Sequence, residues 1–194
     1  MIINNKKIQE KVFSSGGSKQ KILEAAEIKI RRKVNLAKKI LLQKVREHIV
    51  SKELKGGALA NNDSGTLGGY GNLFSFIGFS ANSNPVDDLI SFLDEGIDII
   101  KNPNITRAGK INFSIGIPTK SDFDAALSLP WEYGRSWPHA IENGIGNLGH
   151  FLSRLNEGRS LGGIQVKNEL SNRSFSPIDF ITPILKEFEV QIRS

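Results

Sequence analysis

The spacing of apolar residues in the first third of the chain predicts one long helix. Between Lys19 and about Leu54 there is neither Gly nor Pro, and apolar residues recur at steps of three and four. These apolar positions are Leu23, Ala26, Ile30, Val34, Ala37, Leu41 and Val45. At about 1.5 Å per residue the helix would extend roughly 54 Å. Because this is long for a chain of this size, part of the helix is expected to project toward a neighbouring molecule.

Alternation of apolar and polar residues predicts strands in the middle of the chain. The clearest strand runs from Lys110 to Pro118, where every second residue is apolar: Ile111, Phe113, Ile115 and Ile117. Such alternation is typical of an antiparallel sheet with one face in water. Further strands are predicted at Leu73–Phe79, Ile97–Ile100 and Gly162–Lys167, with a turn at Asn102–Asn104.

Helix-start signals predict shorter helices elsewhere. Asn84 offers a cap, Pro85 suits the first helical position, and acidic residues follow at the positive end of the helix dipole. A second short helix is predicted at Asp122–Leu127. A last helix starts at Ser176–Asp179 or has Pro183 in its first turn, with an inward side formed by Ile178, Ile181, Leu185, Phe188 and Ile192.

These elements predict an α+β fold, in which a long N-terminal helix packs on a small antiparallel sheet with shorter helices, including a C-terminal one. Residues 1–17 are predicted to form an N-terminal arm, with a flexible or turning stretch at Ser14–Ser18. Residues 18–194 are predicted to form a single domain. Its parts are the long basic helix (18–55), a glycine-rich loop (56–72), and the sheet and remaining helices (73–194).

The composition narrows the classes of function. The chain has no cysteine, which excludes disulfides, thiolate zinc sites and cysteine nucleophiles. The first residues lack the apolar core of a signal peptide, and no apolar run approaches the ~20 residues that cross a bilayer. We therefore expect a soluble protein that is cytoplasmic when made and has no membrane partner.

The positive charge of the chain is concentrated in the predicted long helix and its arm. Residues 1–54 hold 14 Lys or Arg and 5 Asp or Glu, a net charge of +9, and the remainder of the chain carries −3, which together give +6. Cations that could contact phosphates are Lys29, Arg31, Arg32, Lys33, Lys38, Lys39, Lys44 and Arg46. Of these, Lys29, Arg32, Lys33, Lys39 and Arg46 are the candidates to face a DNA channel or an acidic partner. A solvated helix face is the alternative, and no aromatic residues interleave as they do in single-strand binders.

The segment 130–144 combines both tryptophans with a Tyr, a His, an Arg and two Glu. Glu132 and Glu142 form a candidate acid and base pair of a carbohydrate-active enzyme, with aromatic rings for stacking on a sugar. The alternative is that the aromatic side chains pack on the sheet while the charges meet partners. His48, His139 and His150 lack metal-ligand spacing, and the glycines of 65–71 match no phosphate-binding pattern, so we expect no metal and no cofactor.

Two short motifs resemble the tail-completion and neck proteins at the head–tail junction of long-tailed bacteriophages. The segment 137–144, Trp-Pro-His-Ala-Ile-Glu-Asn-Gly, is similar to the Tyr-Ala-X-X-Val-Glu-Phe-Gly-Thr motif of that family, but lacks its second aromatic residue and its Thr. The segment 175–183, Phe-Ser-Pro-Ile-Asp-Phe-Ile-Thr-Pro, is similar to the entry to the family's C-terminal helix. The order of predicted elements is similar over most of the chain.

The resemblance implies a non-enzymatic virion protein that is assembled in the host cytoplasm. Such proteins form rings, often sixfold, around the DNA channel, and they join portal-side adaptor proteins to the tail tube. Neck, tail-completion and tail-terminator positions all remain open. Aromatic and Arg side chains most often anchor interfaces, so the interface candidates are Tyr70, Phe74, Phe76, Trp131, Arg135 and Trp137. Their alternative role is ordinary core packing.

Overall fold

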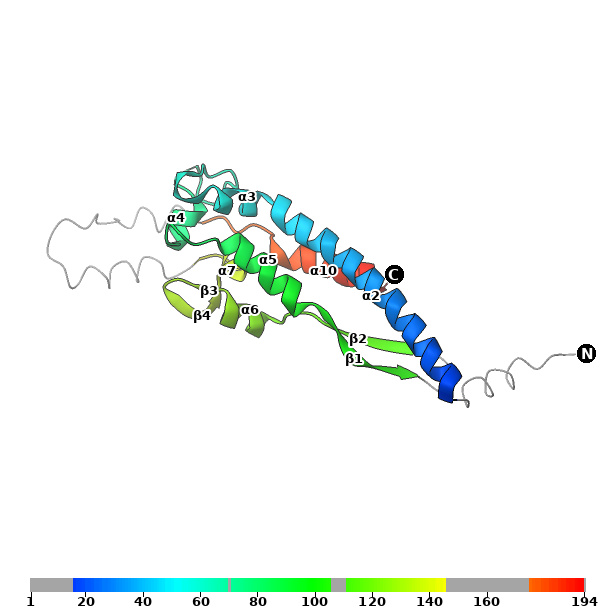
Figure 1. Cartoon of the computed structure of the whole chain (residues 1–194). Helices are drawn as coiled ribbons and strands as arrows, with labels where there is room; N and C mark the ends of the chain where they lie inside the picture. Colours follow the sequence, from blue (N-terminus) through cyan, green and yellow to red (C-terminus); the bar gives the residue numbers. More distant parts are fainter. Residues whose placement is uncertain (1–15, 70, 106–110, 146–174, 194) are drawn as a thin grey trace, which may run out of the picture.

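The computed structural model describes residues 16–69, 71–105, 111–145 and 175–193. Its elements in chain order are α2 (Gly16–Glu47), α3 (Ile49–Lys55), η1 (Gly57–Leu59), α4 (Leu73–Ile77), α5 (Pro85–Gly96), β1 (Asp98–Ile105), β2 (Ile111–Gly116), α6 (Lys120–Ala126), β3 (Ser128–Leu129), β4 (Glu132–Ser136), α7 (Trp137–Asn143) and α10 (Ile181–Arg193). This mixture of helices and antiparallel strands confirms the predicted α+β class (Figure 1). Within these ranges the strands form two separate two-stranded pairs, β1–β2 and β3–β4.

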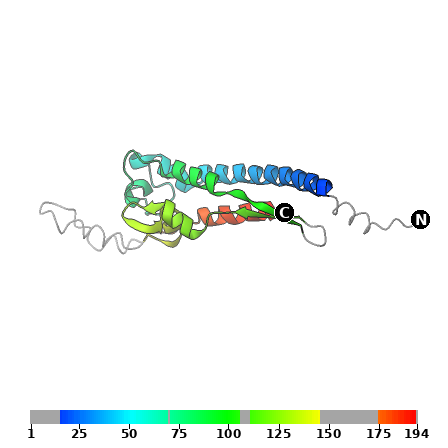
Figure 2. The ribbon, with the colours of Figure 1, turned by 60° about the horizontal axis from the view of Figure 1, so that its bottom comes forward.

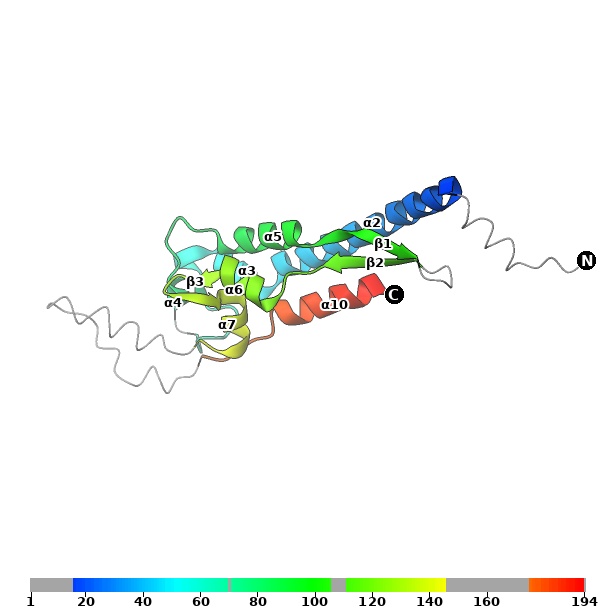
Figure 3. The same ribbon diagram turned by 90° about the horizontal axis from the view of Figure 1, so that it is seen from below.

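The long helix α2 lies beside α5 and α10, and α3, α4 and the β3–β4 pair lie beyond its C-terminal end (Figures 1 and 2). Its buried residues are Val34, Ala37, Leu41, Leu42 and Val45. The apolar spacing had predicted all of these except Leu42, whereas the predicted positions nearer the N-terminus, Leu23, Ala26 and Ile30, are half-buried. The helix has 32 residues, or about 48 Å. Its N-terminal turns extend beyond the end of α10 (Figure 3). It begins at Gly16, so the end of the stretch predicted to be flexible or turning is helical.

The segment predicted as one helix over 18–55 forms two helices, α2 and α3, because the helical backbone is interrupted at His48. The backbone of His48 is extended (φ −62°, ψ 143°), and its Nδ1 accepts a hydrogen bond from the Val50 N–H at 3.3 Å, which caps α3. After this interruption α3 has a new direction, and its Val50 and Leu54 side chains are buried in the core. Without a Gly or Pro at this position, the apolar spacing alone did not reveal it.

The segment predicted as a strand at 73–79 is the short helix α4. The Asn72 side chain accepts a hydrogen bond from the Ser75 N–H at 2.8 Å, and Gly78 ends the helix at φ +83°. An Asn cap at one end and a left-handed glycine at the other outweigh the strand preference of the phenylalanines between them.

The strongest predicted strand is confirmed as β2, which pairs antiparallel with β1. Ile99 lies opposite Ile115, and Ile105 lies opposite Ile111. The predicted turn at 102–104 is wrong, because β1 continues through these residues to Ile105. The pairing is irregular between Ile100 and Asn104. Pro103 lies in this interval, and it has no N–H to donate to a hydrogen bond between the strands.

The helix α5 begins as predicted, but Asn84 makes no side-chain capping bond. Its backbone carbonyl instead accepts from the N–H groups of Asp87 and Asp88, both at 3.0 Å. The predicted helix at 122–127 is α6, shifted toward the N-terminus by a capping box between Thr119 and Asp122.

The C-terminal helix α10 starts at Ile181 and has Pro183 in its first turn, which confirms the second of the two predicted starts. Ile181, Ile184 and Phe188 are buried, and α10 packs along α2. The predicted strand at 162–167 lies outside the described residues. One contiguous core contains side chains from α2, α3, α4, α5, α7 and α10.

Candidate interaction surface

Three cations of α2 pair with acidic residues of neighbouring elements: Arg31, Lys38 and Lys44. Arg31 contacts Glu27 on its own helix and Asp98 at the start of β1. Lys38 Nζ lies 3.0 Å from Asp94 Oδ1 and also donates to the Asp94 carbonyl oxygen at 2.6 Å, near the C-terminus of α5. Lys44 forms an ion pair with the Glu187 carboxylate of α10. These contacts fix α2 to its neighbours and account for part of its basic character.

Five other cations of α2 lie on the opposite side of the helix and have no acidic partner among the described residues. Lys29, Arg32, Lys39 and Arg46 are exposed and Lys33 is half-buried. None of them forms an ion pair with any residue in the described ranges. At about 100° per residue, all five fall within an arc of about 140°, opposite the buried face. We call this arc the outer face of α2; the structure adds which cations of the helix are already paired.

Apolar side chains lie among these cations. Ile28 is 54% exposed, Leu36 63% and Ile40 36%, and all three fall within the same arc. Contact with phosphate uses charge and hydrogen bonds, so exposed Ile and Leu side chains would contribute little to it. A surface that mixes unpaired cations with exposed aliphatic side chains is better matched to another protein.

Two of the six aromatic and Arg interface candidates are core residues of the single chain. Trp137 is 2% exposed; its ring lies edge-on to Phe79 and stacks on Phe180 at 6.0 Å. Phe74 is 3% exposed. Their burial favours core packing, the alternative role, over contact with a neighbouring molecule.

The other interface candidates are held in place by contacts within the chain. Trp131 is half-buried and donates from Nε1 to the Ile77 carbonyl at 2.9 Å. The ring of Phe76 stacks on Phe175 at 5.8 Å. Arg135 donates to the Gly144 carbonyl at 2.5 Å. Tyr70 lies outside the described residues.

Glu132 and Glu142, the candidate catalytic pair, each have a partner in the fold. Glu132 Oε2 lies 3.3 Å from Arg135. Glu142 accepts from the Phe180 N–H at 3.1 Å and from both the N–H and the hydroxyl of Thr182 at 2.6 Å. The carboxylate of Glu142 therefore caps α10 and joins α7 to it. Its position also links the two family-like motifs, 137–144 and 175–183.

A serine, a histidine and an acid lie together beside this cap. Ser136 Oγ is 2.8 Å from His139 Nδ1, and the Ser136 N–H donates to Asp124 at 2.9 Å. The arrangement has the residue types of a hydrolase triad, but Ser136 is fully buried and its hydroxyl is not accessible to a substrate. The contacts instead hold α7 and β4 against α6.

These groups have shifted pKa values. Burial lowers the pKa of His139, an effect that the charges of Glu142 and Asp124 partly oppose. Burial likewise lowers the pKa of His48, which a hydrogen bond to the Asp179 backbone and the charge of Glu142 partly oppose. Burial would raise the pKa of Asp124, but hydrogen bonds from Lys120 and Ser136 and the charge of Lys120 lower it to about 2.

The described part of the chain has neither a candidate metal site nor a helix that could span a membrane. No group of three or more acidic or histidine side chains there is placed to hold a metal ion. His150 lies outside the ranges described. None of the helices that the structure describes is long and apolar enough to cross a bilayer.

The glycine-rich loop is organised from within the chain, by Glu53. This carboxylate is 1% exposed and accepts from the Leu73 N–H at 2.7 Å, the Ser64 N–H at 2.9 Å and the Asn62 side chain at 3.0 Å. Asn62 in turn accepts from the N–H groups of Leu67 and Gly69. These hydrogen bonds order the loop within a single chain. Sequence reasoning missed Glu53, although a carboxylate between the core positions Val50 and Leu54, followed by an Asn- and Ser-rich loop, was the available signal.

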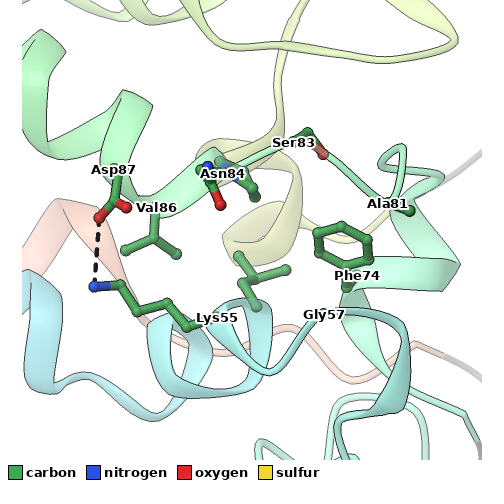
Figure 4. Close-up of a pocket in the computed structure, with 10 residues that line it drawn as sticks. Lys55, Gly57, Phe74, Ala81, Ser83, Asn84, Val86 and Asp87 are labelled. Carbon is green, nitrogen blue, oxygen red and sulfur yellow. Dashed lines mark ion pairs between the residues drawn. The ribbon is translucent and has the colours of Figure 1, made fainter.

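A shallow pocket lies where α3, α4 and the start of α5 meet (Figure 4). Its volume is about 290 Å³, and Leu54, Phe74 and Val86 contribute apolar side chains to it. At its edge Lys55 Nζ and Asp87 Oδ1 are 3.4 Å apart, so these two opposite charges satisfy each other. With no unpaired charge among these groups, the pocket indicates no particular ligand.

Comparison of the chain with protein-family models, curated proteins and solved structures found no match.

Proposed function

We propose that this chain is a structural subunit that acts by assembling with other protein chains, at the head–tail junction of a tailed bacteriophage. The observation that carries the assembly role is the outer face of α2, where unpaired cations and exposed aliphatic side chains lie on one arc. Because Arg31, Lys38 and Lys44 are already matched to acids within the chain, the unmatched cations of the outer face are available to an acidic partner.

The location in a virion rests on the resemblance of the two motifs to neck and tail-completion proteins. The hydrogen bonds from Thr182 to Glu142 join the two motifs and give this carboxylate a structural role that needs no catalysis, which supports the proposal. In this proposal the chain forms a ring of about six copies. The ring joins portal-side proteins to the tail tube, as a tail-completion, tail-terminator or other neck component.

The test is the mass of the purified protein by light scattering behind a sizing column, for the original chain and for Leu36→Glu. We expect a closed oligomer without DNA, and we expect Leu36→Glu to shift it to monomers without lowering the melting temperature. Val190→Glu is the matched control, because Val190 is equally exposed (64%) but lies on α10. A chain that stays monomeric at every concentration would count against assembly on its own.

A second candidate function is non-specific nucleic-acid binding by the outer face of α2. The five unpaired cations on one arc favour it. If each neutralises one phosphate, the logarithm of affinity should fall with the logarithm of salt at a slope of about −4 to −5. Binding to DNA that persists in Leu36→Glu, with no oligomer in the original chain, would favour this function.

The enzyme alternative, with Glu132 and Glu142 as acid and base, has less support. Both carboxylates are engaged in contacts that stabilise the fold. Turnover of an oligosaccharide that is lost in Glu142→Gln, with the fold retained, would favour it.

A further inference from the structure

We infer that the outer face of α2 binds the outer side of α5 in a second copy of the same chain. This inference rests on the proposed function, since it names the partner of the surface that carries it.

The helix α5 has acidic residues of two kinds. Asp87 and Asp94 point along its flank toward α3 and α2, where they pair with Lys55 and Lys38. Asp88 and Glu95 are exposed and form no ion pair within the residues that the structure covers. Together with the exposed Ser91 they form the outer side of α5, opposite its buried residues Val86, Leu89, Ile90 and Leu93. This side is the acidic counterpart of the outer face of α2.

The two surfaces match in spacing as well as in charge. Arg32 and Lys39 are seven residues apart, and so are Asp88 and Glu95. Seven residues are two helical turns, about 10.5 Å along either axis, and bring the second charge back to nearly the same side of the helix. One helix laid along the other therefore forms two ion pairs at once. Leu36, between the two cations, would then be removed from water.

The contact must form between copies. Within one chain α2 and α5 lie side by side, joined by Lys38 and Asp94, and their outer sides both point to solvent (Figures 1 and 3). Neither side can reach the other without unpacking the core. Each copy nevertheless presents one basic and one acidic surface, so it can bind a neighbour through both, as a closed ring of identical subunits requires.

Charge reversal tests this directly. Arg32→Glu with Lys39→Glu lowers the formal net charge by four, from +6 to +2, and Asp88→Lys with Glu95→Lys raises it by four, to +10; all four changes together restore +6. We expect either double variant to weaken self-association at least about tenfold. We expect the quadruple variant, and an equimolar mixture of the two double variants, to associate again.

The matched control is Lys52→Glu with Lys186→Glu, which also gives +2 but changes exposed lysines of α3 and α10. It should assemble as the original chain does, and circular dichroism should show all variants folded. If the original chain assembles and neither double variant weakens it, the inference is overturned while the proposed function stands. If the original chain never assembles, both fail. If reversal of Arg32 and Lys39 abolishes only DNA binding, the surface serves nucleic acid and the inference is again overturned.

Discussion

Replacing Glu142 by Ala should lower the free energy of unfolding by about 2–4 kcal/mol. The carboxylate accepts three hydrogen bonds from the start of α10, at 3.1, 2.6 and 2.6 Å, and each bond to a charged group contributes about 1.5–3 kcal/mol in a buried setting. Glu142 is only half-buried, so water will replace part of this, and N-cap losses reach about 2 kcal/mol on their own. At roughly 2–4 °C per kcal/mol for a chain of this length, a loss near 3 kcal/mol lowers the melting temperature by about 6–12 °C.

The measurement is urea unfolding followed by far-UV circular dichroism. Glu132→Ala is the control, because it removes a partly exposed ion pair with Arg135 that contributes at most about 1 kcal/mol. Glu142→Gln keeps an acceptor but loses the charge, so it should fall between the two. If Glu142→Ala costs no more than Glu132→Ala, the carboxylate does not hold α10 and the capping argument is refuted.

Three further predictions concern Trp137, Glu53 and Asp124. Trp137→Ala should destabilise the monomer by about 3–5 kcal/mol, because the indole is fully enclosed; a stable variant that fails only in assembly would restore the interface role. Glu53→Ala leaves the buried Leu73 N–H without an acceptor, so limited proteolysis should cut the loop 57–69 much faster than in the original chain, whereas equal rates would contradict its organising role. Asp124 has a folded pKa of about 2, below its ordinary 3.8, so its contribution of up to about 2 kcal/mol is present above pH 4 and is lost as the pH falls toward 2. The stabilities of the original chain and Asp124→Asn should therefore converge over that interval, and a constant difference would contradict the shift.

The fold class followed from patterns that are strong over long segments. The buried face of α2 and the alternation in β2 both appear in the structure as the apolar spacing predicts. Short elements were missed where local hydrogen bonds decide the conformation. Asn72 and Gly78 bound a helix inside a strand-like run, and His48 interrupts a helix with no breaker residue.

The candidate site was harder to predict, because it depends on which charges find partners. Arg32 and Arg31 are adjacent and chemically identical, yet of the two only Arg31 pairs with acidic residues in the ranges that the structure describes. The two side chains point in directions about 100° apart around the helix. Which direction leads to an acidic residue is known only once the elements packed against α2 are known. The aromatic residues of segment 130–144 likewise suggested an interface, but Trp137 is buried in the core of the single chain.

The pairing of α2 with α10 has a consequence for synthesis. The two helices lie side by side, but 133 residues separate Glu47 from Ile181 along the chain. At about 5–20 residues per second, a ribosome needs roughly 7–27 s to make the intervening chain. Until then the part of α2 that α10 will cover stays open to water and to other nascent chains. During this interval α5, which is made earlier, is the element available to cover part of α2, and the remaining apolar surface is covered only when α10 has been made.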